Sequence, residues 1–209
     1  AAAGSLVCLR RGFKDASWVI AWGILPALAW WIFGEPRTLM VLLVTLGLAA
    51  LLRAGHSWNR VLVSSIALGL LYAVILGSVF REPIEALARA LEKALPQMLD
   101  GLYQQMSVEQ RTQLGAIIVP VLNGLIAALL QVVSVLALML GRYWQAALYN
   151  PGGFGREFQA VRIPRLPALV LLACMVFGPS FGSAVALLTP LCSVPLMFAG
   201  IALLHGLVA

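Results

Sequence analysis

Residues 61–80 read VLVSSIALGLLYAVILGSVF, a run that contains no charged side chain. An α-helix needs about 20 apolar residues to cross the hydrocarbon core of a bilayer. Backbone N–H and C=O groups cannot bond to water inside lipid, so a spanning segment satisfies them within a helix or within a closed barrel. The run does not alternate polar and apolar residues as barrel strands do. This stretch therefore predicts a transmembrane α-helix.

The whole chain is nearly as apolar as this stretch. Of its 209 residues, 62% are hydrophobic and 11% are charged, whereas soluble domains carry about 25% charged residues. So few polar side chains cannot cover the surface of a fold in water, and lipid removes that requirement. The sequence therefore predicts an all-α, polytopic transmembrane helix bundle that forms a single domain over residues 1–209.

Long apolar runs and the helix breakers between them predict about six membrane spans. The spans are residues 17–33, 38–52, 61–80, 115–140, 166–178 and 184–208. A further apolar run at residues 1–9 resembles the end of a helix, and the last span ends without a polar tail. We therefore expect the chain to be a piece of a longer protein.

Residues 81–113 form one of two polar stretches between the spans. Its apolar residues recur every three or four positions and are Ile84, Leu87, Leu91, Leu95 and Met98. Because the opposite face is charged, the pattern predicts one amphipathic helix. This helix either lies in the membrane interface or acts as a lid over an outward-facing cavity. Ser107 and Gln110 have the spacing of a capping box, which predicts that a new helix begins there.

Basic residues gather on one side of the predicted bundle. With six spans, that side holds nine of the 14 basic residues. These nine are Arg10, Arg11, Lys14, Arg53, Arg60, Arg142, Arg156, Arg162 and Arg165. Only Asp15 and Glu157 of the eight acidic residues accompany them. Because loops rich in Lys and Arg stay in the cytoplasm, residues 141–165 are predicted to be cytoplasmic, and residues 81–113 periplasmic or extracellular.

Two helix faces inside the predicted spans carry small or polar side chains. In residues 61–80, small residues follow each other four positions apart and are Ser65, Gly69, Ala73 and Gly77. Such a stripe lets helices approach closely in lipid, either within the chain or with a partner subunit. In residues 115–140, Asn123, Gln131 and Ser134 share one face. These side chains either bond to neighbouring helices or line a polar cavity that binds a ligand.

The predicted cytoplasmic loop at residues 141–165 has the composition of a structured elbow. Pro151 restricts the backbone, whereas Gly152 and Gly153 permit positive φ, so a sharp reversal is favoured. A short helix after Gly155 would place two phenylalanines on one face against the bundle. The candidate docking residues for lipid phosphate or a partner protein are Asn150, Gly152, Gly153, Phe154, Arg156, Phe158 and Arg162.

No pattern of enzymatic chemistry is found in the sequence. It has no Ser/His/Asp set, no HExxH motif and no phosphate-binding loop. The three cysteines, Cys8, Cys174 and Cys192, lie apart within apolar runs, which predicts buried side chains rather than disulfides or a zinc site. A basic face suited to nucleic acid is also absent from the pattern. We therefore expect a protein without catalytic residues, metal or cofactor.

The predicted elbow carries a motif that resembles a known family. Arg142-Tyr143-Trp144-Gln145 precedes Tyr149-Asn150-Pro151-Gly152-Gly153-Phe154, and Glu157-Phe158 and Arg162 follow. This pattern resembles the YybS-like family of predicted bacterial inner-membrane proteins. That family is distantly similar to the substrate-binding S-components of energy-coupling-factor transporters. The resemblance implies location in the bacterial inner membrane and a role in binding or uptake of a small molecule.

Two functions of different classes therefore follow from the sequence. The first is a non-enzymatic, S-component-like transport subunit that binds a small molecule from outside. The second is a structural or assembly subunit whose cytoplasmic loop docks a membrane or cytoplasmic partner protein. A polar cavity beneath residues 84–98 that reaches Asn123 and Gln131 would favour transport. Tight packing at this place would favour the assembly subunit.

Overall fold

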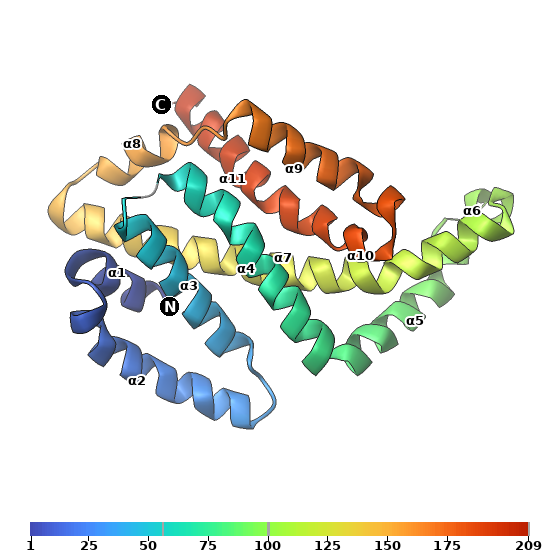
Figure 1. Ribbon diagram of the computed structural model, residues 1–209, viewed down its shortest axis with the longest axis horizontal. Coiled ribbons are helices and arrows are strands. Elements are labelled where there is room, and N and C mark those ends of the chain that lie inside the picture. Colours follow the sequence, from blue (N-terminus) through green and yellow to red (C-terminus); the bar gives the residue numbers. More distant parts are fainter. Residues whose placement is uncertain (56, 100, 209) are drawn as a thin grey trace.

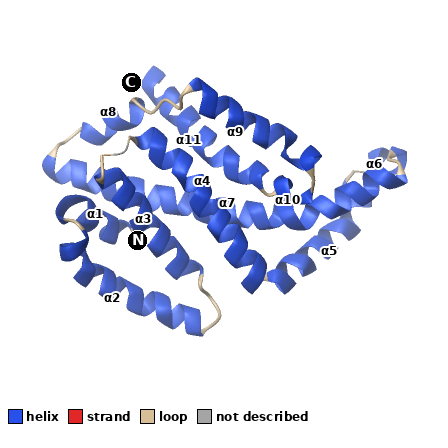
Figure 2. Ribbon diagram, viewed as in Figure 1, coloured by secondary structure: helices blue, strands red, loops and turns tan. Residues whose placement is uncertain are grey.

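The computed structural model describes residues 1–55, 57–99 and 101–208, and within these ranges it contains helices and no strand (Figure 2). In chain order the helices are α1 (Ala2–Arg11), α2 (Phe13–Ile32), α3 (Arg37–Arg53), α4 (Trp58–Val79), α5 (Arg81–Met98), α6 (Gly101–Gln105), α7 (Val108–Tyr149), α8 (Gly153–Gln159), α9 (Arg165–Phe177), the 3-10 helix η1 (Gly178–Phe181), α10 (Ser183–Ala186) and α11 (Leu188–Val208). The prediction of an all-α fold is confirmed.

Helix α7 is the axis of the bundle. It has 42 residues, which at 1.5 Å per residue make it about 63 Å long. Figure 1 shows it crossing the whole molecule, and α1, α3, α4, α5, α8, α10 and α11 all pack against it. Helix α2 lies at the edge against α1 and α3, and α9 lies at the opposite edge against α11.

Helix α7 extends beyond both ends of the span predicted at residues 115–140. It begins at the predicted capping box, in which Gln110 N donates to Ser107 Oγ (3.2 Å) and Ser107 N donates to Gln110 Oε1 (2.8 Å). At the other end the helix continues through Gly141, where the glycine lets α1 pass because a Cβ would collide with Ser5. The first nine residues of the predicted loop 141–165 are thus helical.

Among the described residues, four helical segments are long and apolar enough to cross a membrane. They are Phe13–Ile32, Trp58–Val79, Val108–Tyr149 and Ser183–Val208, and a shorter apolar segment covers Arg165–Phe181. Helix α2 turns most of its large apolar side chains outward, and Trp18 is 72% exposed. In a soluble protein such an apolar surface would favour aggregation, whereas in a membrane it would contact lipid. The helices therefore suit insertion in a membrane.

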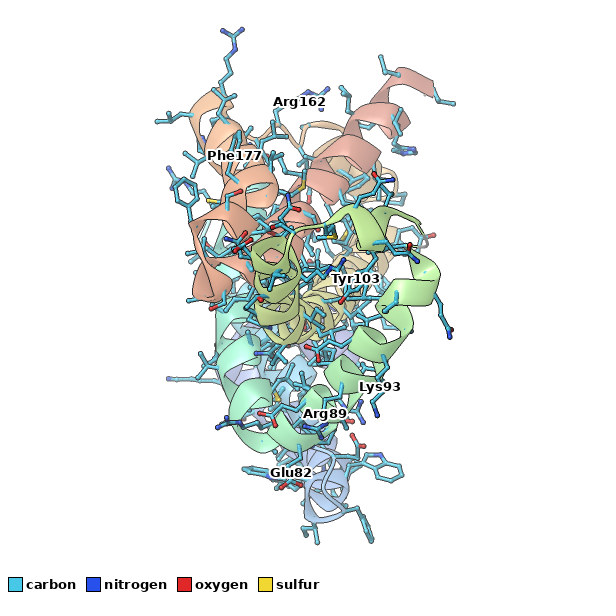
Figure 3. The ribbon with its side chains drawn as sticks, turned by 90° about the vertical axis from the view of Figure 1, so that its right-hand side faces the viewer. Glu82, Arg89, Lys93, Tyr103, Arg162 and Phe177 are labelled. Carbon is cyan, nitrogen blue, oxygen red and sulfur yellow. The ribbon has the colours of Figure 1, made fainter. Side chains whose placement is uncertain are left out.

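Helix α5 lies at the end of the bundle opposite the elbow. It packs Ile84 and Ala88 against the bundle, and of the five apolar residues in the predicted stripe Ile84 is buried, whereas Leu87 is 51% exposed. Figure 3 looks onto this end, with Glu82, Arg89 and Lys93 along α5. The far part of the apolar stripe stays uncovered, and Met98 is 68% exposed, because α5 and the start of α7 extend past the other helices (Figure 1).

Candidate functional site

The interface between α4 and α7 brings together the small stripe and the amide face. Gln131 Nε2 donates to Ser65 Oγ (2.7 Å), and Asn123 Nδ2 donates to the carbonyl of Ala73 (2.9 Å). A Cβ atom on Gly69 would lie 2.7 Å from Gln131 Oε1, and one on Gly77 would lie 3.1 Å from Asn123 Nδ2. The stripe thus makes room for the two amides, and the helix contact is within the chain.

Ser134 belongs to a second buried polar contact, one turn further along α7. The Tyr72 hydroxyl lies 2.7 Å from Ser134 Oγ and 3.2 Å from the carbonyl oxygen of Met40. Thr45 Oγ1 donates to the carbonyl of Ser134 (3.4 Å). These bonds join α3, α4 and α7 without any charged group, which is the form of interhelical bonding that lipid tolerates.

Each of the two amides has one oxygen acceptor that is left without a hydrogen bond to any described residue. Asn123 Oδ1 and Gln131 Oε1 are buried without a hydrogen-bond partner among the described residues, and Gln131 is 1% exposed. The cavity beneath α5 has a volume of about 160 Å³ and is lined by Arg37, Leu76, Phe80, Pro83, Ile84, Leu87 and Ile126. Neither amide lines this cavity. The predicted ligand-binding residues are therefore packed against α4.

At the elbow, one ion pair joins α7 to α8. Arg142 Nε donates to Glu157 Oε2 (3.0 Å), and Nη2 binds the other carboxylate oxygen, so the pair is bidentate. Arg142 Nη1 donates to Gln145 Oε1 (2.7 Å), and Trp58 Nε1 donates to Glu157 Oε2 (3.4 Å). Bidentate Arg–carboxylate pairs fix geometry as well as adding energy. This clamp therefore sets the position of α8.

An aromatic cluster lies beside the clamp. Phe154 packs edge-on against Trp58 (6.1 Å between ring centroids) and Tyr143 (6.2 Å), and it stacks on Phe158 (6.0 Å). Aromatic pairs at such distances contribute about 0.5–1.5 kcal/mol beyond the area that they bury. The two phenylalanines share the inward face of α8, as the sequence predicts. The helix begins at Gly153, earlier than the predicted start after Gly155.

The turn before α8 depends on its glycines. Gly152 has φ +78°, a conformation that residues with a side chain rarely adopt. Gly153 N donates to the carbonyl of Asn150 (2.9 Å), and a Cβ on Gly153 would collide with the Asn150 side chain. The bond and the close approach produce the reversal that the sequence predicts at Asn150–Gly153.

The arginines of the elbow differ in their roles. Arg156 is exposed on α8. Arg162 donates through Nη1 to the carbonyls of Gln159 and Val161, and its backbone N donates to Asn59 Oδ1 (2.8 Å). The start of α4 thus contributes to the elbow through Trp58 and Asn59. The signal for Trp58 in the sequence is its place beside a span, because tryptophan there is typical of the membrane interface.

A cavity opens where five helices meet beside the clamp. Its volume is about 650 Å³. Its lining residues are Leu9, Leu52, Arg53, Ser57, Trp58, Asn59, Arg142, Gln145, Glu157, Ala160 and Val161. Arg53 closes one wall, because its Nη1 donates to the carbonyls of Cys8 (3.1 Å) and Leu9 (2.9 Å) at the C-terminal end of α1.

Comparison of the chain with family models, with curated proteins and with solved structures finds no match. The similarity of the elbow motif to the YybS-like family therefore stays an expectation from the sequence. The described residues contain no group of three or more His, Cys, Asp or Glu side chains that could hold a metal ion. The function has to follow from the geometry of the chain itself.

Proposed function

We propose that the chain is an integral protein of the bacterial inner membrane that crosses it six times, with the elbow in the cytoplasm. Helices α2, α4, α7 and α11 have the length for this. Helix α3 has 17 residues and α9 has 13, so each borrows flanking residues or tilts less to cross a core of about 30 Å. The nine basic residues counted above border the turns at the elbow end, which supports this orientation.

Within the membrane, the chain acts as a non-enzymatic assembly subunit whose elbow docks a partner protein. The observation that carries this proposal is the clamp between Arg142 and Glu157. A loop that only connects two spans does not need one shape, whereas this loop is held by a bidentate ion pair and a stacked aromatic cluster. The exposed cation of Arg156 then stands on a rigid platform, as recognition of an acidic surface requires.

Substitution of Arg156 tests the docking role. In Arg156→Glu the fold should be unchanged, because the side chain is exposed, while recovery of a stoichiometric partner from native membranes should fall about tenfold or more. Lys93→Glu is the matched control, since it reverses an exposed charge at the opposite end. Equal recovery with both variants, or a wild-type chain that purifies without any partner, would contradict the proposal.

The transport role is the second candidate, and one observation favours it. Asn123 Oδ1 and Gln131 Oε1 are unpaired acceptors at mid-helix depth, so a small molecule with N–H or O–H donors would satisfy both. Such a ligand would enter only if α4 and α7 separate. A transport subunit should gain thermal stability from a small uncharged solute, and Gln131→Met should abolish that gain. If no solute in a broad panel stabilises the wild-type chain, this candidate is wrong.

A further inference from the structure

The cavity beside the clamp has the size of a small-molecule site. Its volume of about 650 Å³ lies within the range of about 300–1,000 Å³ that is typical of ligand pockets. Four aliphatic residues, Leu9, Leu52, Ala160 and Val161, form part of the wall, and most of the other lining residues are polar. The function proposed above makes no use of this cavity.

The side-chain acceptors that line the cavity are almost all occupied. Both carboxylate oxygens of Glu157 accept from Arg142, and Oε2 also accepts from Trp58. Gln145 Oε1 accepts from Arg142. Asn59 Oδ1 accepts from the backbone N–H of Arg162. Each amide is thereby held with its oxygen engaged, so the group left for a ligand is its NH₂.

The donors that line the cavity are largely free. The described residues supply no hydrogen-bond partner to the NH₂ groups of Asn59 and Gln145, or to Nε and Nη2 of Arg53. Glu157 neutralises Arg142, whereas Arg53 forms no ion pair with a described residue. The cavity thus offers donors and one uncompensated positive charge, and the complementary ligand is an anion rich in acceptors.

We propose that this cavity binds a phosphate group. The three free donor groups come from α3, the start of α4 and the end of α7, and the residues that carry them, Arg53, Asn59 and Gln145, all line the cavity. A carboxylate has two oxygens, whereas a phosphate has enough to accept from a guanidinium and from two amides together. The phosphate belongs either to an anionic phospholipid headgroup or to a soluble phosphorylated compound. This inference stands apart from partner docking at Arg156.

Two isosteric variants test the donor argument. Gln145→Glu and Asn59→Asp each keep the oxygen that accepts the existing hydrogen bond, and each replaces the free NH₂ donor by a carboxylate oxygen. Arg60→Gln is the matched control, because it removes one positive charge at the same end from a residue that does not line the cavity. Circular dichroism and melting temperature establish that each full-length variant is folded.

Binding is measured with inorganic phosphate and then with lipid. Calorimetric titration of the detergent-purified chain compares phosphate with chloride at equal ionic strength. Native mass spectrometry of the chain from nanodiscs compares retention of phosphatidylglycerol with that of phosphatidylcholine. Each isosteric variant should weaken phosphate affinity or phosphatidylglycerol retention by about tenfold or more, since a repelling charge replaces a charge-assisted bond. The control should stay within about twofold of wild type.

Each outcome supports or overturns the proposal, and the supporting outcomes also identify the source of the phosphate group. Binding of inorganic phosphate supports a soluble ligand, and selective retention of phosphatidylglycerol without phosphate binding supports a lipid headgroup. The proposal is overturned if the wild-type chain prefers neither phosphate to chloride nor phosphatidylglycerol to phosphatidylcholine. It is also overturned if the folded isosteric variants bind as wild type does, or if Arg60→Gln weakens binding as much as they do.

Discussion

Glycines decide how closely the helices around α7 approach it. A Cβ on Gly124 would lie 2.5 Å from the carbonyl oxygen of Leu187 and 2.9 Å from Pro190 Cγ. Backbone cannot rotate away as a flexible side chain can, so the crossing of α7 with α10 and α11 requires glycine. At Gly77 the nearest atom is the end of the Asn123 side chain, which can move.

The crossing at Gly124 gives the first prediction. Gly124→Ala should lower the free energy of unfolding by about 1–3 kcal/mol, the usual cost of overpacking. Gly47→Ala should be neutral or slightly stabilising, because no atom outside its own neighbourhood lies within 4 Å of that Cβ position. Melting temperatures in one detergent measure both. Equal melting temperatures for the two variants would mean that α7 and α10 are not packed at this point.

The clamp between Arg142 and Glu157 gives the second prediction. Their side chains are 23% and 34% exposed, so removal of one partner leaves the other charge partly desolvated. In a double-mutant cycle with Arg142→Met and Glu157→Gln, the coupling energy should be about 0.5–3 kcal/mol. Urea unfolding of the detergent-solubilised protein measures it. Strictly additive effects would show that the pair contributes nothing to holding α8.

At the scale of the element, α5 carries an exposed ion pair within its first turns. Arg81 Nε donates to Glu85 Oε1 (2.7 Å) one turn away, and this hydrogen bond holds the pKa of the Glu85 carboxyl below its ordinary value of 4.5. A carboxyl with a lowered pKa stabilises the folded form fully above the pKa of the unfolded chain. That contribution is lost as the pH falls through the lower, folded value.

The third prediction follows from the direction of this pKa shift. Hydrogen exchange of the α5 backbone should be slow at pH 6 and should accelerate relative to the spanning helices below pH 4.5, the ordinary value of the carboxyl. In Glu85→Gln the relative protection should depend on pH less than in wild type, because the carboxyl that accepts from Arg81 is gone while Glu82 and Glu92 remain. The idea fails if wild type and variant show the same pH dependence.

At the scale of the whole molecule, the arrangement places charges at two ends. Arg156 on α8 and Lys93 on α5 are both exposed, and the two helices that carry them lie toward opposite ends of α7 (Figure 1), with Lys93 on α5 labelled in Figure 3. The length of α7, about 63 Å at 1.5 Å per residue, exceeds the whole bilayer thickness of about 40–45 Å. If the bundle spans the membrane, the two ends of α7 therefore lie in different aqueous compartments.

The fourth prediction is the orientation. With Cys8, Cys174 and Cys192 replaced by alanine, Lys93→Cys should react with a membrane-impermeant thiol reagent in intact cells. Arg156→Cys should react only after the cells are lysed, because the proposed orientation places the basic end in the cytoplasm. The opposite labelling pattern would reverse the topology, and labelling of both positions in intact cells would rule out a spanning bundle.

The sequence by itself determined the long helices. A helix forms its backbone hydrogen bonds within one segment, so the length of an apolar run and the breakers that end it are sufficient to predict it. The sequence also determined the start of α7, since the capping box joins residues three positions apart. It predicted the faces that hold Gln131 and the small stripe from helical periodicity alone. It did not locate the end of α7, because polar residues such as Arg142 and Gln145 extend a helix when they bond along it.

Only the tertiary structure decided what those faces contact. Gln131 bonds to Ser65, which is 66 positions away, and Asn123 bonds to Ala73, which is 50 positions away. An amide in a span can bond to a helix or line a cavity, and the choice depends on which helix arrives opposite it. The same holds for the elbow, where Trp58 reaches Glu157 on α8 and Asn59 reaches Arg162, both from the start of α4. Periodicity specifies one face of a helix, whereas a contact needs two, and the second comes from the fold.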